Sequence, residues 1–374
     1  MGRNFKNCFL LEILLLLFFC TPVFANYLFE EKTGEQNPFD GLELGVVTSP
    51  AIGDIDGDSD LEALVGSNSG TIRSFSLNSA GDFIENTESP LISFTTDIQV
   101  KPTLFDWNGD DFPDLFVGKY DPKETNPGMI LYYENDQSGN FTEKSSLNPF
   151  VAIDGLGVCK VTFGEFSSTV TGQEAFVGVS GQDDGSGGEE GALRYFILDA
   201  DGEYVEATSP LDFSRSNEQP KPFAIDYDQD SDGLFDILVG LSSGTSTLRV
   251  FLNNGSPETP NFSSSNFNSL KDSGTESSLP IDFSDPIILN FDGDNQRDLF
   301  LGTLNDGILY FEEPGGIQGN FDCDTDLDIN DAILGLKILS GFQPTKVCAE
   351  NEVTGDGKIG IEDVIYVLRV LANP

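Results

Sequence analysis

A pattern that recurs five times limits the fold of this 374-residue chain more than any other feature. Each copy holds an apolar segment, a polar loop, and an acid followed by three apolar residues and a glycine, as in AIGDIDGDSDLEALVG. The closing glycines are Gly66, Gly118, Gly178, Gly240 and Gly302, spaced by 52, 60, 62 and 62 residues. A second alternating apolar run follows each glycine, which indicates short strands without helical periodicity. About four strands in a period near 60 residues are typical of a propeller blade, so we predict a mostly β fold, a five-bladed β-propeller.

Four of the five polar loops carry side-chain oxygens at positions 1, 3, 5 and 9, and the backbone carbonyl of position 7 can add another ligand. The predicted ligand sets are Asp54, Asp56, Asp58, Asp60 and Glu62; Asp106, Asn108, Asp110, Phe112 and Asp114; Asp228, Asp230, Asp232, Leu234 and Asp236; and Asn290, Asp292, Asp294, Gln296 and Asp298. Six or more oxygens in an irregular cage suit Ca²⁺ better than Mg²⁺. An acidic surface turn is the alternative for a single loop, because Asp and Asn favour turns. Repetition in register favours calcium.

The third repeat lacks the acidic loop. Between Glu165 and Glu174 it reads FSSTVTGQ, without an acidic side chain. We therefore expect one blade that binds no metal, and we infer that calcium stabilises the blades and takes no part in chemistry.

Charge and composition exclude several classes of function. Lys and Arg number 19 against 63 Asp and Glu, a formal net charge of −44, which disfavours nucleic acid and anionic membranes as partners. The chain has no histidine. That absence removes Ser-His-Asp and Cys-His catalytic machinery and any His-ligated metal site.

These repeats resemble the FG-GAP and VCBS repeats of secreted bacterial proteins and of integrin α-subunit propellers, over about residues 27–318. The resemblance implies a calcium-stabilised propeller used for recognition or adhesion, sometimes attached to polysaccharide-active enzymes. Integrin propellers have seven blades and only five are visible here, so the integrin mode of ligand binding is not carried over. The opening segment YLFEEKTGEQNPF resembles the segment YYENDQSGNFTEKSSLNPF after a later blade. It can therefore complete the last blade and remove a free sheet edge.

From Asn320 the apolar spacing becomes helical, and two segments align with an offset of 32 residues. Ligand positions extend over twelve residues and a helix begins at the end of each loop, which is the EF-hand arrangement. The predicted ligands are Asn320, Asp322, Asp324, Asp326, Asp328 and Asp331 in the first loop, and Glu352, Thr354, Asp356, Lys358 and Asp363 in the second. The apolar stripes of the helices are Ala332, Leu336 and Leu339, and Val364, Val367, Leu368 and Leu371. Gly341 and Asn373 follow the helices, where left-handed caps are expected.

This duplicated loop and helix resembles the dockerin family over about residues 319–374. The resemblance implies two calcium ions, folding coupled to calcium, and docking onto a cohesin partner. The recognition pair that is often Ser-Thr is Ile329-Asn330 and Ile361-Glu362 here, and the second loop begins with Glu352. The first loop is therefore expected to bind calcium more tightly. A calcium-bound cap without a partner is the alternative.

The first 25 residues have the form of a secretory signal, since Arg3 and Lys6 precede the apolar run LEILLLLFFC and Ala25 closes the segment. The run is too short to predict a membrane span. We predict an exported chain, secreted or at the cell surface, with a propeller over residues 26–318 and a dockerin-like module over residues 319–374.

Export also permits disulfides. Cys323 and Cys348 bracket a compact C-terminal segment, and we predict a disulfide between them; two unpaired thiols are the alternative. Cys159 lies in the apolar run GVCKVTF and is predicted to be a buried thiol, because no histidine is present to activate it.

These features predict extracellular recognition or scaffolding, with a glycan or surface protein as ligand and a possible cohesin-like partner, and they identify no catalytic residue. The alternative is a secreted carbohydrate-active enzyme that degrades polysaccharide, or an accessory subunit of one, because paired carboxylates abound. Nearly every clustered acid already has a calcium role, however, and Trp107 lies inside a calcium loop. Tyr132, Tyr133 and Tyr195 lie in strands and are expected to pack.

Overall fold

The structure, a computed structural model, describes residues 29–372 apart from 87–89, 96, 126, 154–155, 168–173, 184–188, 200, 212, 217–218, 226–233, 243–247, 254, 256–259, 267–269, 272–284, 294–295, 306, 314–318, 323–326, 328, 345–346 and 349–357. The predicted signal peptide, residues 1–25, lies outside the described residues. The chain divides into two compact units, Leu28–Pro314 and a second that includes Gly315–Pro374. In the described part of the chain, no helix is long and apolar enough to cross a membrane.

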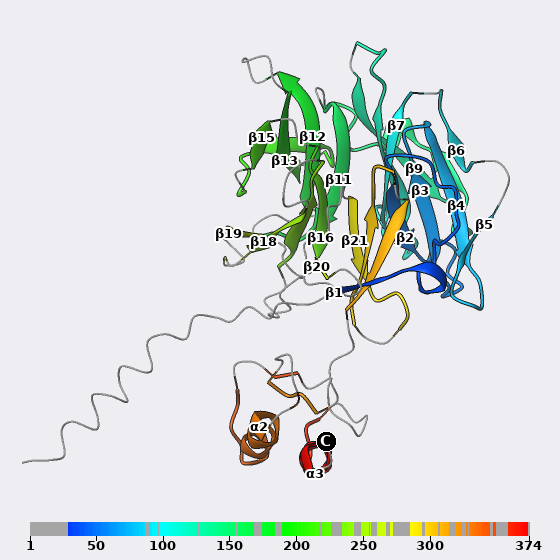
Figure 1. The fold of residues 1–374 in the computed structure, drawn as a ribbon. Helices are drawn as coiled ribbons and strands as arrows, with labels where there is room; N and C mark the ends of the chain where they lie inside the picture. The colour runs from blue at the N-terminus through cyan, green and yellow to red at the C-terminus, as the bar shows by residue number, and fades with distance from the viewer. Residues whose placement is uncertain are drawn as a thin grey trace, which may run out of the picture. The chain divides into compact units, whose positions relative to one another are not determined.

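The larger unit is a five-bladed β-propeller, which confirms the predicted architecture (Figure 1). Blade 1 consists of β2 (Ser49–Gly53), β3 (Glu62–Gly66), β4 (Thr71–Leu77), β5 (Phe83–Glu85) and β6 (Ile92–Ser93). Blade 2 consists of β7 (Gln99–Phe105), β8 (Asp114–Tyr120), β9 (Gly128–Asn135) and β10 (Phe141–Glu143). Blade 3 consists of β11 (Val158–Gly164), β12 (Glu174–Asp183), β13 (Glu189–Leu198), β14 (Tyr204–Ala207) and β15 (Ser214–Ser216). Blade 4 consists of β16 (Lys221–Ile225), β17 (Asp236–Gly240), β18 (Leu248–Asn253) and β19 (Phe262–Asn266).

Blade 5 joins both ends of the propeller chain. Its strands are β21 (Asp285–Leu289), β22 (Asp298–Gly302), β23 (Ile308–Glu312), β1 (Phe29–Lys32) and β20 (Leu270–Lys271). The N-terminal strand β1 runs antiparallel to β23, with Glu31 opposite Phe311. This pairing confirms that the opening segment completes the last blade, and it covers an edge that would otherwise be open to other strands. Two short 3₁₀ helices, Gly34–Gln36 and Ser145–Leu147, lie in connections.

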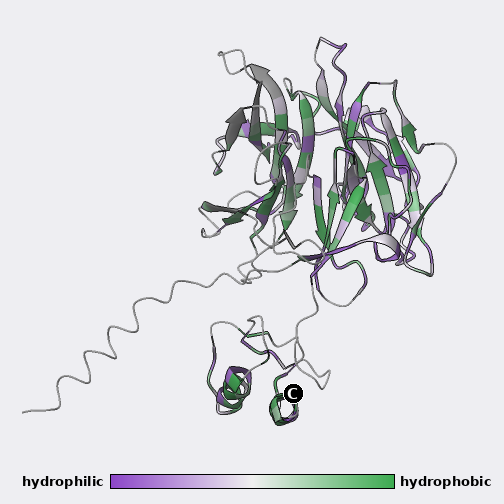
Figure 2. Ribbon diagram, in the orientation of Figure 1, coloured by the Kyte–Doolittle hydropathy of each residue, from purple (hydrophilic) through white to green (hydrophobic). Residues whose placement is uncertain are grey.

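The core lies between neighbouring sheets, where aromatic side chains from two blades meet. Phe116 of blade 2 packs against Phe163 of blade 3, with ring centroids 4.7 Å apart. Phe39 lies between Phe75 of blade 1 and Phe300 of blade 5, in edge-to-face contact with both. Figure 2 shows hydrophobic residues along the described strands. These contacts give the many phenylalanines of the sequence a packing role.

Four of the closing glycines, Gly66, Gly118, Gly178 and Gly302, lie where adjacent blades approach closely. A Cβ atom on Gly66 would lie 2.7 Å from Cδ of Pro102 in the innermost strand of the next blade, and closer still to the carbonyl oxygen of Val100. Gly118, Gly178 and Gly302 face the carbonyl oxygens of Cys159, Pro220 and Thr48 in the same way. Thr48 precedes the first strand of blade 1. Gly302 therefore makes between blades 5 and 1 the same close backbone contact that Gly66 makes between blades 1 and 2. Close approach of two backbones thus explains why these repeats end in glycine.

The C-terminal unit contains α2 (Ile329–Leu339) and α3 (Ile361–Ala372). Gly335 of α2 faces Val364 of α3 so closely that a Cβ on the glycine would lie 2.6 Å from Cγ2 of the valine. Gly341, with φ of 93°, ends α2: its N–H donates to the carbonyl of Ile338, and the next N–H donates to the carbonyl of Lys337. This arrangement confirms the predicted left-handed cap at Gly341. Asn373 lies outside the described residues.

The predicted apolar stripes of these helices are wrong in part. Ala332, Val364 and Val367 are buried, as expected, but Leu336, Leu339 and Leu368 are 49%, 45% and 42% exposed. The buried face of α2 is instead centred on Asp331, Ala332 and Gly335. The absence of a side chain at Gly335 lets the helices approach, and Leu334 and Ile338 pack partly against the same core, whereas Leu336 and Leu339 are exposed.

Candidate metal-binding loops and axial channel

The first acidic loop joins β2 to β3 and gathers three carboxylates. Carboxylate oxygens of Asp54, Asp56 and Asp58 all lie within 4.8 Å of one another. Asp54 shapes the loop, because its carboxylate accepts hydrogen bonds from the N–H of Gly57 at 2.7 Å and of Ser59 at 3.0 Å. Both donors have positive φ, 79° and 75°, so the backbone turns tightly around the acid. Converging carboxylate oxygens of this kind are the ligands that Ca²⁺ prefers.

The loop between β7 and β8 repeats this turn. The Asp106 carboxylate accepts hydrogen bonds from Gly109 N–H at 2.8 Å and Asp111 N–H at 3.0 Å, and both donors again have positive φ. Asp110 accepts a hydrogen bond from the Asn108 amide. The two loops therefore share one backbone shape, which brings the predicted positions 1, 3 and 5 of the second loop into the same kind of turn.

The loop before β22 keeps the beginning of the turn. Asn290 Oδ1 accepts a hydrogen bond from Gly293 N–H at 2.9 Å, and φ of Gly293 is 81°. An asparagine amide oxygen thus does at position 1 what an aspartate carboxylate does in the first two loops.

The acid that opens the second strand, at position 9 in four blades and one residue later in blade 3, is buried in all five. These residues are Glu62, Asp114, Glu174, Asp236 and Asp298. The Asp114 carboxylate accepts hydrogen bonds from the Tyr132 hydroxyl and from Asn135 N–H, both at 2.9 Å. In blade 3, where no metal is predicted, Glu174 accepts hydrogen bonds from the N–H groups of Phe166 and Ser167. This acid therefore joins the second strand to the third strand in blade 2 and to the preceding loop in blade 3.

Glu62 is affected directly by the charges of the first loop. Its carboxylate accepts a hydrogen bond from Ile55 N–H at 3.1 Å. The pKa of Glu62 is raised to about 7, mainly by burial and further by the neighbouring loop aspartates. The hydrogen bond from Ile55 acts in the opposite direction and lowers the pKa. A bound cation would favour the ionised form of this carboxyl.

Several predicted ligands lie outside the described residues: Asp228, Asp230, Asp232, Asp294, Asp324, Asp326, Asp328, Glu352, Thr354 and Asp356. Among those described, Asp60 and Phe112 at position 7 donate their N–H groups to Asp58 and Asp110. In the C-terminal unit, Asn320, Asp331 and Asp363 are buried. Asp331 accepts a hydrogen bond from Phe321 N–H, and Asp363 accepts one from Gly360 N–H. The other described positions are Leu234, Asp292, Gln296, Asp322 and Lys358.

The cysteines differ in state. Cys159 is free and buried, as predicted, and burial raises the pKa of its thiol to about 12, which keeps it protonated. Cys348 is disulfide-bonded, while Cys323, its predicted partner, lies outside the described residues.

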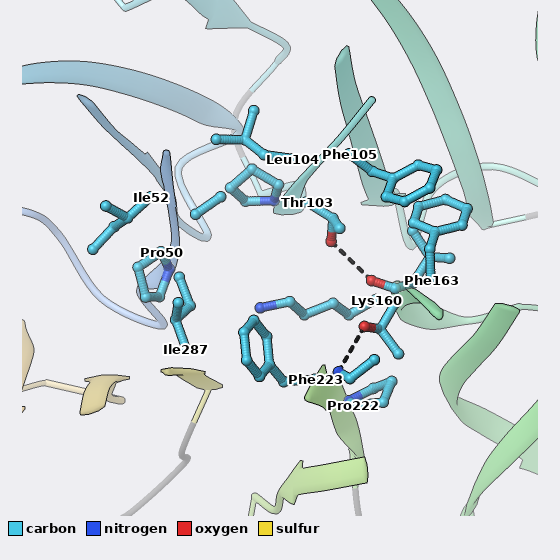
Figure 3. A pocket seen from close by; sticks show the side chains of 15 residues that line it. Pro50, Ile52, Thr103, Leu104, Phe105, Lys160, Phe163, Pro222, Phe223 and Ile287 are labelled. Carbon is cyan, nitrogen blue, oxygen red and sulfur yellow. Dashed lines mark hydrogen bonds between the residues drawn. The ribbon is translucent and has the colours of Figure 1, made fainter. Parts of the chain in front are cut away.

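The innermost strands of all five blades, β2, β7, β11, β16 and β21, surround a cavity of about 130 Å³ on the propeller axis. Figure 3 shows the side chain of Lys160 extended across this axial channel, with Thr103, Phe163 and Phe223 around it. Hydrogen bonds from Thr103 Oγ1 to the carbonyl of Val161 and from Ala224 N–H to Thr162 Oγ1 tie neighbouring innermost strands together. The channel wall is thus mainly apolar, with a few polar groups.

A buried polar ring lies at one end of the channel, at the level of the closing glycines, and Lys160 is its member that lines the cavity. We call it the axial ring, and its members are Ser49, Lys101, Lys160, Lys221 and Asp285. Each lies opposite the closing glycine of its own blade in the strand pairing, so the five occupy one level. Sequence reasoning missed this ring. Its signal is the residue 17–19 positions before each closing glycine, which precedes a proline in four of the five repeats.

Comparison with known proteins leaves the family open. No protein-family description matches the chain, and no curated protein matches it. Solved structures with a similar fold include one titled for the GH130 family of mannoside phosphorylases, with glycoside hydrolases that target β-1,2 mannosidic linkages in Candida mannan (10% identity, TM-score 0.42, 72% of this chain and 84% of that chain). Others are a glycoside hydrolase (10%, 0.45, 71% and 87%) and an exo-1,5-α-L-arabinanase from a bovine ruminal metagenomic library (9%, 0.39, 70% and 91%). With TM-scores below 0.5, these likenesses identify neither a family nor a ligand for this chain.

Proposed function

We propose that this chain is a secreted calcium-binding recognition and scaffolding protein. Its propeller binds calcium in the acidic loops of four blades and recognises an extracellular glycan or surface protein, and its C-terminal unit is a dockerin-like pair of EF-hand loops that docks onto a partner. The observation that carries the proposal is the convergence of Asp54, Asp56 and Asp58.

Electrostatics supports a cation in these loops. Two of the three aspartates in the first loop are exposed, so each pair of charges costs roughly 1 kcal/mol at about 4 Å in a water-like dielectric. The repulsion acts among all three and on buried Glu62, whose pKa is raised. A divalent cation turns this repulsion into attraction and stabilises the blade by mass action.

An exposed apolar stripe supports docking by the C-terminal unit. Its residues are Ile329, Ile333 and Leu336 of α2 and Ile361, Ile365 and Leu368 of α3, each between 40% and 53% exposed. The two sets occupy equivalent positions, 32 residues apart, so the two helices offer the same surface twice. Apolar groups of this kind on a small unit are typical of protein interfaces. The partner proposed is a protein with an apolar docking face, of which a cohesin is one example.

The alternative function is a secreted polysaccharide-degrading enzyme. The structural neighbours are glycoside hydrolases, which is the enzyme class of this alternative. Their TM-scores are below 0.5, so the residues of this chain must distinguish the two functions. Hydrolysis of a glycosidic bond ordinarily needs two carboxyl groups flanking it. Among the residues that the structure describes, those lining the channel include no carboxylate, and Asp285 of the axial ring is ion-paired to Lys160. These features favour a binding function.

Calcium-dependent melting tests the proposal. The mature chain, residues 26–374, should melt at a higher temperature in calcium than in excess chelator. Each site should add about 2.7 kcal/mol to the free energy of unfolding when calcium is at 100 times its dissociation constant. Asp56→Ala should weaken the calcium response, whereas Asp40→Ala, which removes an equal charge outside the loops, should preserve it. An unchanged melting temperature in chelator would refute the calcium assignment. A glycan array beside a reducing-end release assay, both in calcium, separates binding from hydrolysis.

A further inference from the structure

The axial ring places an unusual balance of charge inside the propeller. Its three lysines, Lys101, Lys160 and Lys221, and its one aspartate are each no more than 3% exposed. Lys160 forms an ion pair with Asp285, and Lys101 Nζ lies 3.9 Å from the other carboxylate oxygen. One carboxylate therefore faces three amines within the ring.

The pKa values reflect this excess of positive charge. Burial by itself raises the pKa of Asp285, but the three lysines outweigh burial and hold it below its usual value. The pKa of Lys101 is lowered to about 8, first by burial and also by the neighbouring Lys160, although Asp285 opposes the shift. The lowered pKa means that burial in the ring disfavours the ammonium form of Lys101, so an additional negative charge at this level would stabilise that form.

The fifth member of the ring supplies a neutral donor. Ser49 is fully buried, and among the residues that the structure describes its Oγ has no hydrogen-bond partner. Buried hydroxyl groups normally form hydrogen bonds. A serine hydroxyl at the same level as three amines is a donor set suited to an oxyanion.

The cavity provides space next to this donor set. It is lined by Lys160 of the ring and, from the same innermost strands, by Phe105, Phe163, Phe223 and Thr103 (Figure 3). Apolar and aromatic walls with a few convergent polar groups are typical of small-molecule sites. The negative charge of a ligand would meet the amines while its body lies among these side chains.

We propose that the axial ring binds a compact oxyanion, such as the carboxylate of a single acidic sugar, with the body of the ligand in the channel. This inference rests on the recognition function proposed above and gives it a site and a ligand class. A free inorganic oxyanion shares the same chemistry, and the experiment distinguishes the two sources.

The experiment is calorimetric titration of the mature chain in saturating calcium, with sodium glucuronate, glucose and sodium sulfate as probes at constant ionic strength. The test variant is Lys101→Met with Lys221→Met, which leaves the Lys160–Asp285 pair intact and one charge of each sign in the ring. Such a variant should fold, because replacing buried charges by apolar side chains of similar size is often neutral or stabilising. Lys144→Met is the matched control, since Lys144 pairs with Glu134 in blade 2 and its side chain is 37% exposed.

Glucuronate should bind the wild type and the Lys144→Met control, and glucose should bind at least about tenfold more weakly. The double variant should bind glucuronate at least about tenfold more weakly than the wild type, a loss of roughly 1.4 kcal/mol. Tighter glucuronate than sulfate identifies an organic anion, and equal or tighter sulfate identifies an inorganic one. The proposal is overturned if neither anion binds the wild type, or if the double variant, with its calcium-dependent melting intact, binds as well as the wild type. Loss of calcium-dependent melting in the wild type would instead count against the proposed function alone.

Discussion

Substitution of a closing glycine by alanine tests how the blades pack. In Gly66→Ala the new methyl group would lie 2.7 Å from Pro102 Cδ and 3.1 Å from the Val100 carbonyl carbon, and closer still to its oxygen. Real Cβ atoms essentially never approach other heavy atoms to less than 3.0 Å. Blade 1 and blade 2 must therefore separate locally, because the obstacle is backbone and not a side chain that can rotate away.

The magnitude follows from overpacking of a rigid contact. Inserting a methyl group into a filled site costs about 1–3 kcal/mol, and the backbone contact puts Gly66→Ala near the upper end. At about 2–4 °C per kcal/mol for a large domain, a loss of ~3 kcal/mol lowers the melting temperature by roughly 6–12 °C. Gly53→Ala in the same blade is the control, since its methyl group would lie 3.4 Å from Leu104 Cδ1, an ordinary contact.

Circular dichroism melting in calcium measures the difference. Gly302→Ala should cost about as much as Gly66→Ala, because its methyl group would lie 2.8 Å from Pro50 Cδ in blade 1. Equal melting temperatures for Gly66→Ala and Gly53→Ala would show that the blades do not meet as described. A large loss in Gly66→Ala with none in Gly302→Ala would refute closure of the ring between blades 5 and 1.

Three further outcomes are expected. Tyr132→Phe should destabilise the propeller by about 1–2 kcal/mol in denaturant unfolding, because buried Asp114 loses a hydrogen bond, while Tyr120→Phe in the same blade should be near neutral. Alkylation of the unfolded mature chain without reductant should label Cys159 alone, and mass spectrometry showing label on Cys348 would contradict the disulfide. Calcium should raise the melting temperature more than an equal concentration of magnesium, because the loops offer irregular oxygen cages, and equal effects would count against calcium selectivity.

The sequence predicted the blades because each repeat encodes its own local structure. Alternating apolar residues specify the strands, and Gly66 and its equivalents mark where adjacent blades approach. The stripe on α2 misled the prediction because helical spacing alone does not say which face is covered. The close approach of α3 at Gly335 determines which face of α2 is buried. In the sequence, a glycine inside a helix indicates only a position that is unfavourable for helix formation.

The axial ring was not predicted because its members occupy equivalent positions in the blades but differ in residue type. Serine, lysine and aspartate at equivalent positions do not form a motif, and lysine is rarely fully buried, so each reads as an exposed residue. Only closure of five blades brings Lys160 beside Asp285, 125 residues away in sequence. The acidic loops were visible in the sequence because the predicted ligands of each loop lie in one short continuous segment of the chain.

Calcium and the axial ring should be coupled through charge. Each innermost strand leads from the ring toward a polar loop, and Lys101 and Asp106 are five residues apart, or about 16 Å of extended strand. Calcium bound in the four proposed loops would add eight positive charges, and each would stabilise a bound anion by roughly 0.15 kcal/mol at 10 mM salt, where the screening length is about 30 Å. The sum is about 1 kcal/mol, or roughly fivefold to tenfold in affinity, and it falls below about twofold at 150 mM salt. Titration of glucuronate with calcium or chelator, at both salt concentrations and below the melting temperature of the calcium-free protein, measures this coupling. A calcium effect that is equally large at high salt would show that calcium acts on the ring through a change in structure and not through charge.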